Sequence, residues 1–321
     1  MKKFALIGAA GYIAPRHLKA MKETGNQLIA AYDPNDSVGV IDGFFPNASF
    51  YTEFERFDRY VEKIRRQGNG VDYVSICSPN YLHDAHIRFG LRNMANVICE
   101  KPLVLNSWNV DSLMESEKET GLRVYTILQL RLHPVLQELK KKIDSTKRTQ
   151  KYELDLTYIT SRGNWYYASW KGDINKSGGI ATNIGIHFFD MLIWLFGDVQ
   201  ENKVHLHTHD RAAGYLEFEN ARVKWFLSIN STTLPAEIRE KGKTTYRSIT
   251  IDSEPLEFSD GFTDLHTISY TEILAGRGFT LQDAKPAVCL AHEIRDMDTI
   301  GLVGEYHPFA KLPQVKHPFL L

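Results

Sequence analysis

The first residues of the chain combine a strand and a glycine turn that together restrict the fold. Phe4–Ile7 is a short apolar run typical of a buried parallel strand, and small residues follow it at Gly8, Gly11 and Ala14. Small residues there allow a tight turn, a close approach to a pyrophosphate, and packing of helix on strand. The spacing differs by one residue from the G-x-G-x-x-G pattern. We expect a dinucleotide-binding unit in which the cofactor contacts include Gly8, Gly11, Tyr12 and Ile13.

A second apolar run, Leu28–Tyr32, ends at an acidic residue, Asp33. It lies about 20 residues past the glycine turn, where a carboxylate accepts the ribose hydroxyls of a dinucleotide. A carboxylate would repel the 2′-phosphate of NADP, so the sequence predicts NAD as the cofactor. The alternative for Asp33 is a helix-capping role before Pro34.

Apolar runs and helical segments continue to alternate. Tyr73–Ile76 and Val97–Cys99 each end at polar residues, and Val124–Ile127 is the last run of this kind. This alternation predicts an α/β domain at residues 1–128, a Rossmann-type doubly wound parallel sheet. Ligands bind beyond the carboxyl ends of such strands. We therefore expect further cofactor contacts from Ser78, Pro79, Asn80, His83, Glu100 and Lys101.

The pattern changes after residue 128. Runs such as Tyr152–Thr160 and Val223–Ser228 read as strands with mostly short links, and Ile186–Leu195 is an apolar helix. Residues 129–321 are predicted to form a substrate-binding and oligomerisation α+β domain with an open antiparallel sheet. A last helical stretch, about Leu281–Val303, is expected to return to the first domain.

Composition bounds the function class. The 321 residues are 43% hydrophobic, enough for two separate cores. A formal net charge of −1 without long single-sign runs gives no support for nucleic-acid binding. Three cysteines, two of them in apolar runs, indicate a reduced cytoplasmic protein, and we expect no membrane span.

Two groups of polar residues in the second half are candidates for substrate binding. Asn183 and His187 lie four residues apart where a glycine-rich approach enters the apolar helix. The other group provides cations for a diphosphate or carboxylate and aromatic planes for a base or sugar. Its members are Arg131, Arg162, Trp165, Tyr166, Trp170, Lys171 and Lys176. The alternative for the stretch around Trp165 is a packing cluster at a sheet edge.

His205, His207 and His209 alternate along a predicted strand, which places three imidazoles on one face. A metal site is one interpretation, but residues so spaced close poorly on one ion. We favour a hydrated or subunit-facing sheet surface and expect no metal.

Two further alternatives for the function of the protein stay open: a dehydrogenase of a free polyol or simple sugar, and a non-enzymatic dinucleotide sensor.

The glycine turn, Asp33, Ser78-Pro79-Asn80, Glu100-Lys101-Pro102 and the Gly185-x-His187 helix start resemble the Gfo/Idh/MocA oxidoreductase family. The resemblance covers nearly the whole chain. It implies that Lys101 and His187 flank the reacting carbon and that dimers or tetramers form through the second sheet. Many members carry aspartate where this chain has Asn183, which can orient His187 but adds no charge. We therefore expect a catalytic set of Lys101, His187 and Asn183, with Lys101 as base at a lowered pKa.

Within the family, four stretches are most similar to bacterial sugar-nucleotide 3-dehydrogenases of the WlbA type: 8–17, 162–166, 169–173 and 176–187. That resemblance implies NAD-dependent oxidation at C3 of UDP-N-acetylglucosaminuronic acid, in the biosynthesis of lipopolysaccharide. Some members regenerate NAD with 2-oxoglutarate, which we add as an expected second partner.

Overall fold

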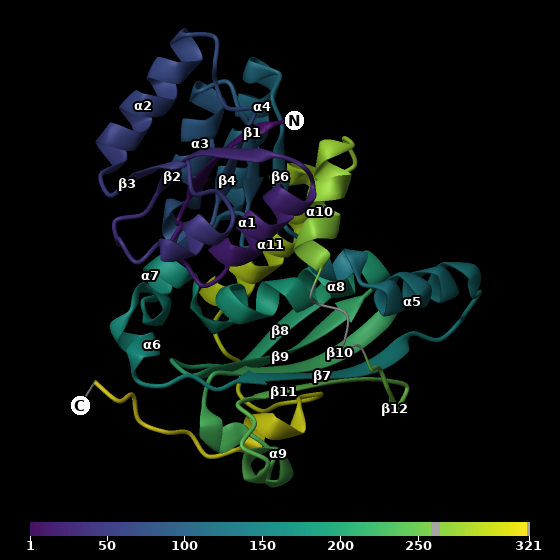
Figure 1. Cartoon of the computed structure of the whole chain (residues 1–321). Helices are drawn as coiled ribbons and strands as arrows, with labels where there is room; N and C mark the ends of the chain where they lie inside the picture. The colour runs from purple at the N-terminus through teal and green to yellow at the C-terminus, as the bar shows by residue number, and fades with distance from the viewer. Residues whose placement is uncertain (258–263, 320–321) are drawn as a thin grey trace. The chain divides into compact units, whose positions relative to one another are not determined.

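A computed structural model describes residues 1–257 and 264–319, and the chain divides into two compact units (Figure 1). Unit 1 comprises residues 1–132 and 262–285, and unit 2 comprises residues 133–261 and 286–321. The segment that returns to unit 1 contains α10 (Leu265–Leu274) and the first residues of α11 (Leu281–Asp296). The sequence prediction placed the end of the first domain at residue 128, expected only a later helix to return, and extended that helix to Val303.

The sheet of unit 1 is a six-stranded parallel sheet in the order β3-β2-β1-β4-β5-β6. Its strands are β1 (Lys3–Ile7), β2 (Gln27–Tyr32), β3 (Ser49–Tyr51), β4 (Tyr73–Ile76), β5 (Asn96–Cys99) and β6 (Val124–Thr126). This is the strand order of a Rossmann fold, whose crevice lies at the carboxyl ends of β1 and β4. The predicted doubly wound sheet is confirmed.

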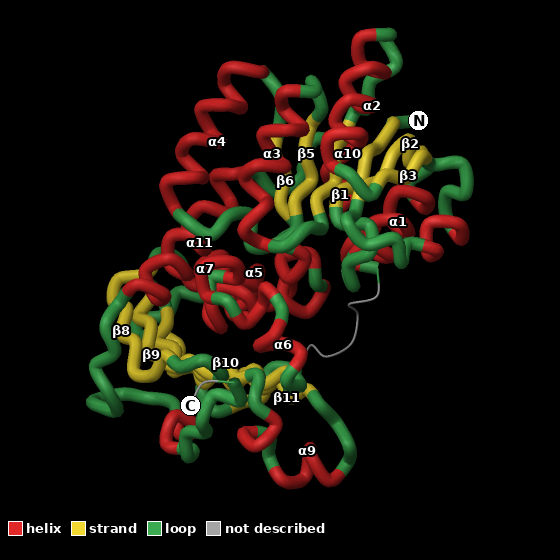
Figure 2. Tube along the Cα trace, turned by 90° about the vertical axis from the view of Figure 1, so that its left-hand side faces the viewer, coloured by secondary structure: helices red, strands yellow, loops and turns green. Residues whose placement is uncertain are grey.

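Helices cover both faces of this sheet (Figure 2). On one face, α1 (Ala14–Glu23) and α10 share a core with β1, in which Leu18 and Tyr270 pack with Phe4. On the other face lie α2 (Phe54–Arg66), α3 (His83–Arg92) and α4 (Ser107–Thr120). The rings of Phe57 and Phe89 join α2 to α3 at 5.3 Å.

The sheet of unit 2 has the order β12-β11-β7-β10-β9-β8. Its strands are β7 (Tyr152–Thr160), β8 (Val199–His207), β9 (Arg211–Phe218), β10 (Ala221–Ser228), β11 (Thr245–Ile251) and β12 (Glu254–Pro255). The central pair β7–β10 is parallel and the other pairs are antiparallel. The prediction of an antiparallel sheet was therefore wrong at its centre. Parallel strands need a long connection between them. The connection from β7 to β10 provides it, because it contains helices as well as β8 and β9.

Both faces of the second sheet carry packed segments. The apolar helix α8 (Ile186–Phe196) covers one face, where Phe189 meets Trp225 at 5.4 Å. On the opposite face, Ile159 and Phe226 pack with residues that precede and follow α9 (Ala236–Glu240) or belong to the C-terminal segment, including Leu234, Phe309 and Ala310. The chain's own C-terminal segment therefore lies on this face, and the expected helix covers the other. The remaining helices of the unit are α5 (Pro134–Ser145), α6 (Trp165–Ala168) and α7 (Ile174–Ser177).

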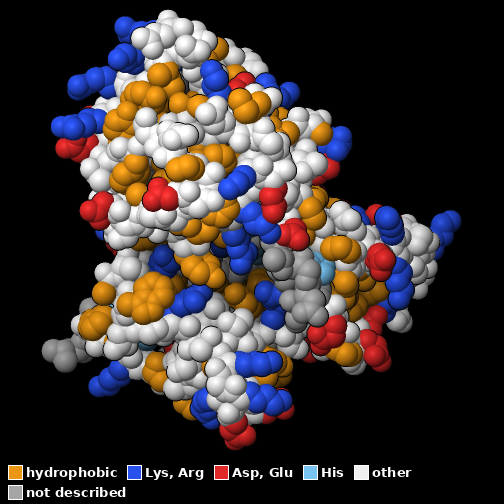
Figure 3. Space-filling view, viewed as in Figure 1, with side chains coloured by type: hydrophobic (Ala, Val, Ile, Leu, Met, Phe, Trp, Pro, Cys, Tyr) orange, Lys and Arg blue, Asp and Glu red, His pale blue; other side chains and the backbone are white. Residues whose placement is uncertain are grey.

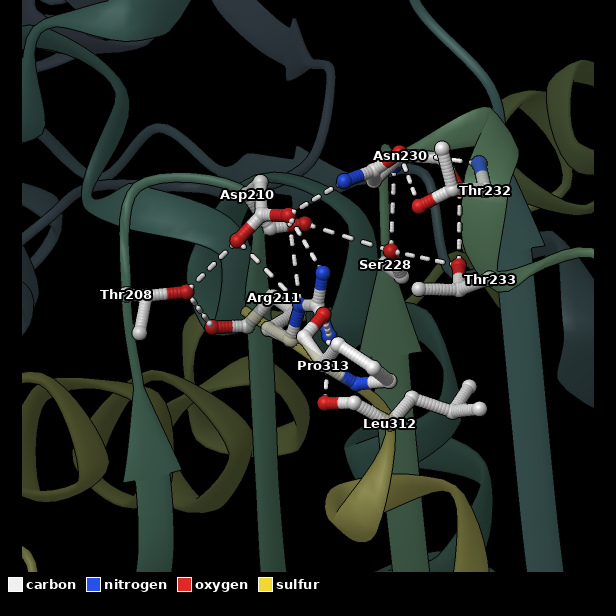
Figure 4. A network of polar contacts seen from close by, with 9 residues as sticks. All are labelled: Thr208, Asp210, Arg211, Ser228, Asn230, Thr232, Thr233, Leu312 and Pro313. Carbon is white, nitrogen blue, oxygen red and sulfur yellow. Dashed lines mark hydrogen bonds and ion pairs between the residues drawn. The ribbon is translucent and has the colours of Figure 1, made fainter. Parts of the chain in front are cut away.

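A fully buried arginine fastens the C-terminal segment to this sheet (Figure 4). Arg211 donates to the Asp210 carboxylate at 2.9 Å and to the carbonyl oxygens of Leu312 and Pro313 at 3.1 and 3.0 Å. Asp210 also accepts a hydrogen bond from Asn230 at 2.7 Å. Each buried charge thus has a partner, as burial requires.

Three composition-based expectations can be compared with the structure. On the face in Figure 3, Lys and Arg side chains are interspersed with Asp and Glu, in keeping with the net charge of −1. All three cysteines are free. The expectation of no membrane span was too strong, because the helical run Ile174–Phe196 is long and apolar enough by length and composition. Of its most apolar window, 72% is buried inside the protein, as in a core helix.

Candidate functional site

The glycine turn brings the end of β1 against the end of β4. Gly8 has a φ of +89°, and a Cβ at this position would lie 2.5 Å from the Cys77 carbonyl carbon. No other residue fits this conformation and this distance. Gly11 donates its N–H to the Gly8 carbonyl at 3.1 Å, which closes the turn before α1 begins. Tyr12 beside it is almost fully exposed.

Asp33 holds its carboxylate across the same turn. Oδ2 accepts the Ala10 N–H at 3.0 Å, and Oδ1 accepts the Asn35 N–H at 2.9 Å. Each oxygen keeps a second lone pair, so the carboxylate can still accept ribose hydroxyls. The glycine turn, which a Cβ would fill, and this oriented carboxylate fit an NAD molecule. Gly8, Gly11 and Asp33 are the residues that would hold it.

His83 joins the two loops that follow β4 and β5. Its Nε2 lies 2.8 Å from the Ser78 carbonyl oxygen and its Nδ1 lies 2.7 Å from the Pro102 carbonyl oxygen. The ring is buried, and burial lowers the pKa of His83. In the same region the Ser78 hydroxyl and His86 Nδ1 are 2.8 Å apart. His83 thus fixes the loop backbone, and Pro79 and Asn80 lie on the loop that it holds.

Glu100 and Lys101 follow β5 directly and differ in burial. Lys101 is half-buried and precedes Pro102 through a cis peptide bond. Glu100 is buried, and its Oε1 faces His17 Nε2 at 3.0 Å and His266 Nε2 at 2.9 Å. Oε1 of Glu100 therefore faces two buried imidazoles of unit 1, although the sequence predicted Glu100 as a cofactor contact.

The sequence did not indicate a role for three residues of this region, His17, His266 and Tyr270. His17 is on α1 directly after the glycine turn, whereas His266 and Tyr270 come from α10. No sequence spacing connects α10 to Glu100, so no pattern in the sequence predicts that His266 and Tyr270 lie in the same network as Glu100. Arg131, which we expected to bind substrate, donates to the backbone oxygen of Asp283 at 3.0 Å and lies over the Phe279 ring.

In unit 2, the candidates Asn183 and His187 lie on a widened helical turn. Ala181–Gly185 forms a π-helical turn, which leads directly into α8 with His187 in its first turn. Such turns are frequent at functional sites. Asn183 donates to the Tyr166 hydroxyl at 2.7 Å. Tyr166 is buried, so it anchors Asn183 rather than offering an exposed stacking plane.

The neighbouring segment carries the predicted cations and aromatic rings. The Lys171 ammonium lies 4.3 Å from the ring centre of Trp170 and 5.8 Å from that of Trp165, which is half-exposed. Arg162 is exposed, and Lys176 lies 3.5 Å from Asp173. An indole with a cation beside it and a nearby guanidinium can bind an anionic ligand that carries a base or sugar.

The histidines of β8 do not form the row that strand alternation predicted. The pairing of β8 with β9 shifts between Val204 and Leu206, so His205 sits in a bulge. Both ring nitrogens of His205 face backbone carbonyl oxygens, those of Gly301 and Glu305. His205 is therefore neither hydrated nor paired with His207 on one face.

Comparison with known proteins covers both units. The model of the oxidoreductase family NAD-binding Rossmann fold (GFO_IDH_MocA) matches residues 2–127, and that of the C-terminal alpha/beta domain matches residues 140–241. WlbA (WbpB) dehydrogenase from Thermus thermophilus has been solved with NAD and UDP-GlcNAcA, and with NAD and alpha-ketoglutarate. Those structures are 52% and 53% identical to this chain, with a TM-score of 0.93, over 96% of this chain and 100% of theirs.

Curated relatives are more distant. Putative oxidoreductase YteT from Bacillus subtilis (strain 168) is 26% identical over 159 residues, which is 49% of this chain. Glucose-6-phosphate 3-dehydrogenase from the same organism is 24% identical over 206 residues, which is 61% of this chain. The matches span 36% and 54% of those two proteins.

Proposed function

The chain belongs to the Gfo/Idh/MocA oxidoreductase family, and from this we propose that it oxidises a sugar-nucleotide hydroxyl with NAD, at C3 of UDP-GlcNAcA. The likeness to the Thermus WlbA structures over the whole length of those chains is the observation that carries the proposal. The oriented Asp33 carboxylate supports NAD as the cofactor. The product would be the 3-keto sugar nucleotide, for lipopolysaccharide biosynthesis in the cytoplasm.

In the proposed reaction, Lys101 accepts the proton of the C3 hydroxyl while hydride leaves the same carbon. NAD supplies the hydride acceptor when it is bound. The position of Lys101 at the carboxyl end of β5 supports this role, because ligands of such sheets bind at that edge. We assign to His187 a hydrogen bond to the same hydroxyl, with Asn183 as its neighbour one helical turn earlier.

The exposed segment around Trp165 is proposed to bind the nucleotide part of the substrate. Trp165 offers a stacking plane, and Arg162, Lys171 and Lys176 offer cations for the diphosphate or the carboxylate. We also propose 2-oxoglutarate as the acceptor that regenerates NAD, and a dimer or tetramer as the assembly.

The test is NADH absorbance with a panel of substrates. We expect reduction of NAD with UDP-GlcNAcA. When 2-oxoglutarate is added, NADH is oxidised back to NAD, and catalytic turnover is measured from the 2-hydroxyglutarate that forms. UDP-GlcNAc lacks the sugar carboxylate of UDP-GlcNAcA and so tests whether the enzyme needs that group. Inositol and free sugars test the alternative of a polyol or sugar dehydrogenase. Reduction of NAD only by a free sugar would contradict the proposal. Binding of NAD without turnover of any substrate would favour the non-enzymatic sensor.

A further inference from the structure

A chain of buried hydrogen bonds in unit 1 ends beside Lys101. Glu100 lies at its centre, between α1 and α10. His17 and His266 place Nε2 against the same carboxylate oxygen, Oε1, at 3.0 and 2.9 Å. Both imidazoles and the carboxylate are buried. A buried carboxylate is stable only when several donors satisfy it.

The series of hydrogen bonds continues from the other ring nitrogen of His17. Nδ1 lies 2.8 Å from the Tyr270 hydroxyl, and that hydroxyl lies 2.7 Å from the hydroxyl of Ser75 on β4. Ser75 and Tyr270 are fully buried. The network thus joins α1, α10 and two neighbouring strands of the sheet.

The positions of the hydrogens follow from the charge of Glu100. Burial alone raises the pKa of Glu100, but the hydrogen bonds from His17 and His266 outweigh it and hold the pKa well below its ordinary value. An ionised carboxylate only accepts hydrogen bonds, so Nε2 of each imidazole carries a hydrogen.

The same reasoning assigns the rest of the network. Burial lowers the pKa of His17, so its ring is neutral and Nδ1 is an acceptor. The Tyr270 hydroxyl therefore donates to His17, and the Ser75 hydroxyl donates to Tyr270. With Glu100 ionised and His17 neutral, every contact of the network joins one donor to one acceptor.

We propose that His17, His266 and Tyr270 are positioning residues that orient the Glu100 carboxylate toward Lys101. Its other oxygen, Oε2, accepts the backbone N–H of Lys101 at 3.2 Å, which fixes the start of the turn. The negative charge also stabilises the ammonium form of the lysine and so sets the pH at which it becomes a base. This inference rests on the proposed role of Lys101 as proton acceptor.

Three titratable groups near Glu100, namely His83, Cys77 and Cys99, do not supply a competing charge; burial lowers the pKa of His83, so its ring is neutral. Cys77 follows β4 and Cys99 ends β5, and both thiols are buried. Burial raises the pKa of each thiol well above its ordinary value, and the Glu100 carboxylate adds to the effect. Both therefore stay neutral at physiological pH.

The experiment measures the titration of Lys101 directly in the full-length protein. Lysines are reductively methylated with ¹³C-formaldehyde, and the NMR signal of Lys101 is assigned by its absence in Lys101→Met. We expect Glu100→Gln to lower the titration midpoint by about one pH unit and Tyr270→Phe to lower it by less. Tyr73→Phe is the matched control, because Tyr73 stacks on the same Phe4 ring at 5.1 Å.

Several outcomes overturn the proposal. Unchanged midpoints in Glu100→Gln and Tyr270→Phe, with lowered thermal stability, would make the network purely structural. Stoichiometric metal that disappears in His266→Asn would also overturn it, because the nitrogens would then bind metal instead of donating hydrogens. The titration needs no substrate, so shifted midpoints in a protein that oxidises no sugar nucleotide would support the coupling and refute the function.

Discussion

Among the described residues, each unit contains a buried charged network, and the two networks are built from different side chains. In unit 2, Arg211 pairs with Asp210 and with two backbone carbonyls of the C-terminal segment (Figure 4). In unit 1, Glu100 is held by two imidazoles, with a tyrosine behind one of them. Arginine stays protonated at every relevant pH, whereas imidazoles titrate near neutrality.

We therefore expect the Arg211 network to have a structural role and the Glu100 network to have a role that depends on protonation. The Arg211 network fixes a chain segment and keeps its charge balance, so we expect it to govern stability. The Glu100 network adjoins the candidate catalytic lysine, so we expect it to govern the proton affinity of that lysine. Variants on each side should therefore change different measured quantities.

The largest expected effect on activity is that of Lys101→Met. Methionine preserves the length of the side chain but cannot accept a proton. Loss of a general base lowers turnover by about 10²–10⁴-fold. We expect that loss in kcat by NADH absorbance, with the unfolding temperature nearly unchanged. Near-normal turnover with the same pH profile would make His187 the candidate base.

Arg211→Met should give the largest loss of stability. It leaves the Asp210 carboxylate buried without its cation, which typically destabilises a protein by about 3–5 kcal/mol. Urea unfolding measures this loss, and kcat should stay unchanged where the variant is folded. Arg222→Met is the control, because the pair of Arg222 with Glu153 is exposed and contributes about 0–1 kcal/mol. Equal losses in both variants would mean that burial of the Arg211–Asp210 pair adds nothing to its effect on stability.

His307, a buried histidine in unit 2, should make the stability of the protein depend on pH. Burial lowers the pKa of His307 to about 4, and Nδ1 accepts the Phe309 N–H at 3.2 Å. Between pH 6.5 and pH 4 the unfolded chain binds a proton that the folded chain does not. Stability is therefore complete above pH 6.5 and falls by about 3 kcal/mol as the pH drops to 4.

His307→Asn should reduce this pH dependence. Asparagine keeps an acceptor for the Phe309 N–H but does not titrate in this range. Urea unfolding at pH 7 and at pH 4.5 should show a smaller difference in the variant than in the unchanged protein. The same difference in both proteins would assign the acid sensitivity to other groups.

The smallest expected effect on stability is that of Arg162→Ala. This arginine is exposed, so its removal should change stability by less than about 1 kcal/mol. If Arg162 binds the anionic substrate, KM should rise while the unfolding temperature stays nearly constant. A large stability loss with unchanged KM would instead assign the segment around Trp165 to packing.

The sequence by itself determined the features that depend on neighbouring residues. The parallel strands of unit 1 and their polar ends at Gly8, Asp33 and Lys101 follow from apolar runs that stop at turn-forming residues. The start of α8 at Ile186 and the bounds of β7 follow from the same local patterns. These patterns are readable because a buried element must show a continuous or periodic apolar side.

Only the tertiary structure decided which distant residues meet. His266 reaches Glu100 and Tyr270 reaches His17 because the chain returns to unit 1 after unit 2 has begun, and no spacing encodes that return. The parallel pairing of β7 with β10 likewise depends on a partner strand far away in the sequence, and the bulge at His205 depends on how β8 pairs with β9. Hydrogen bonds between such partners stabilise the fold as strongly as local ones, but they leave no periodic signal in the chain.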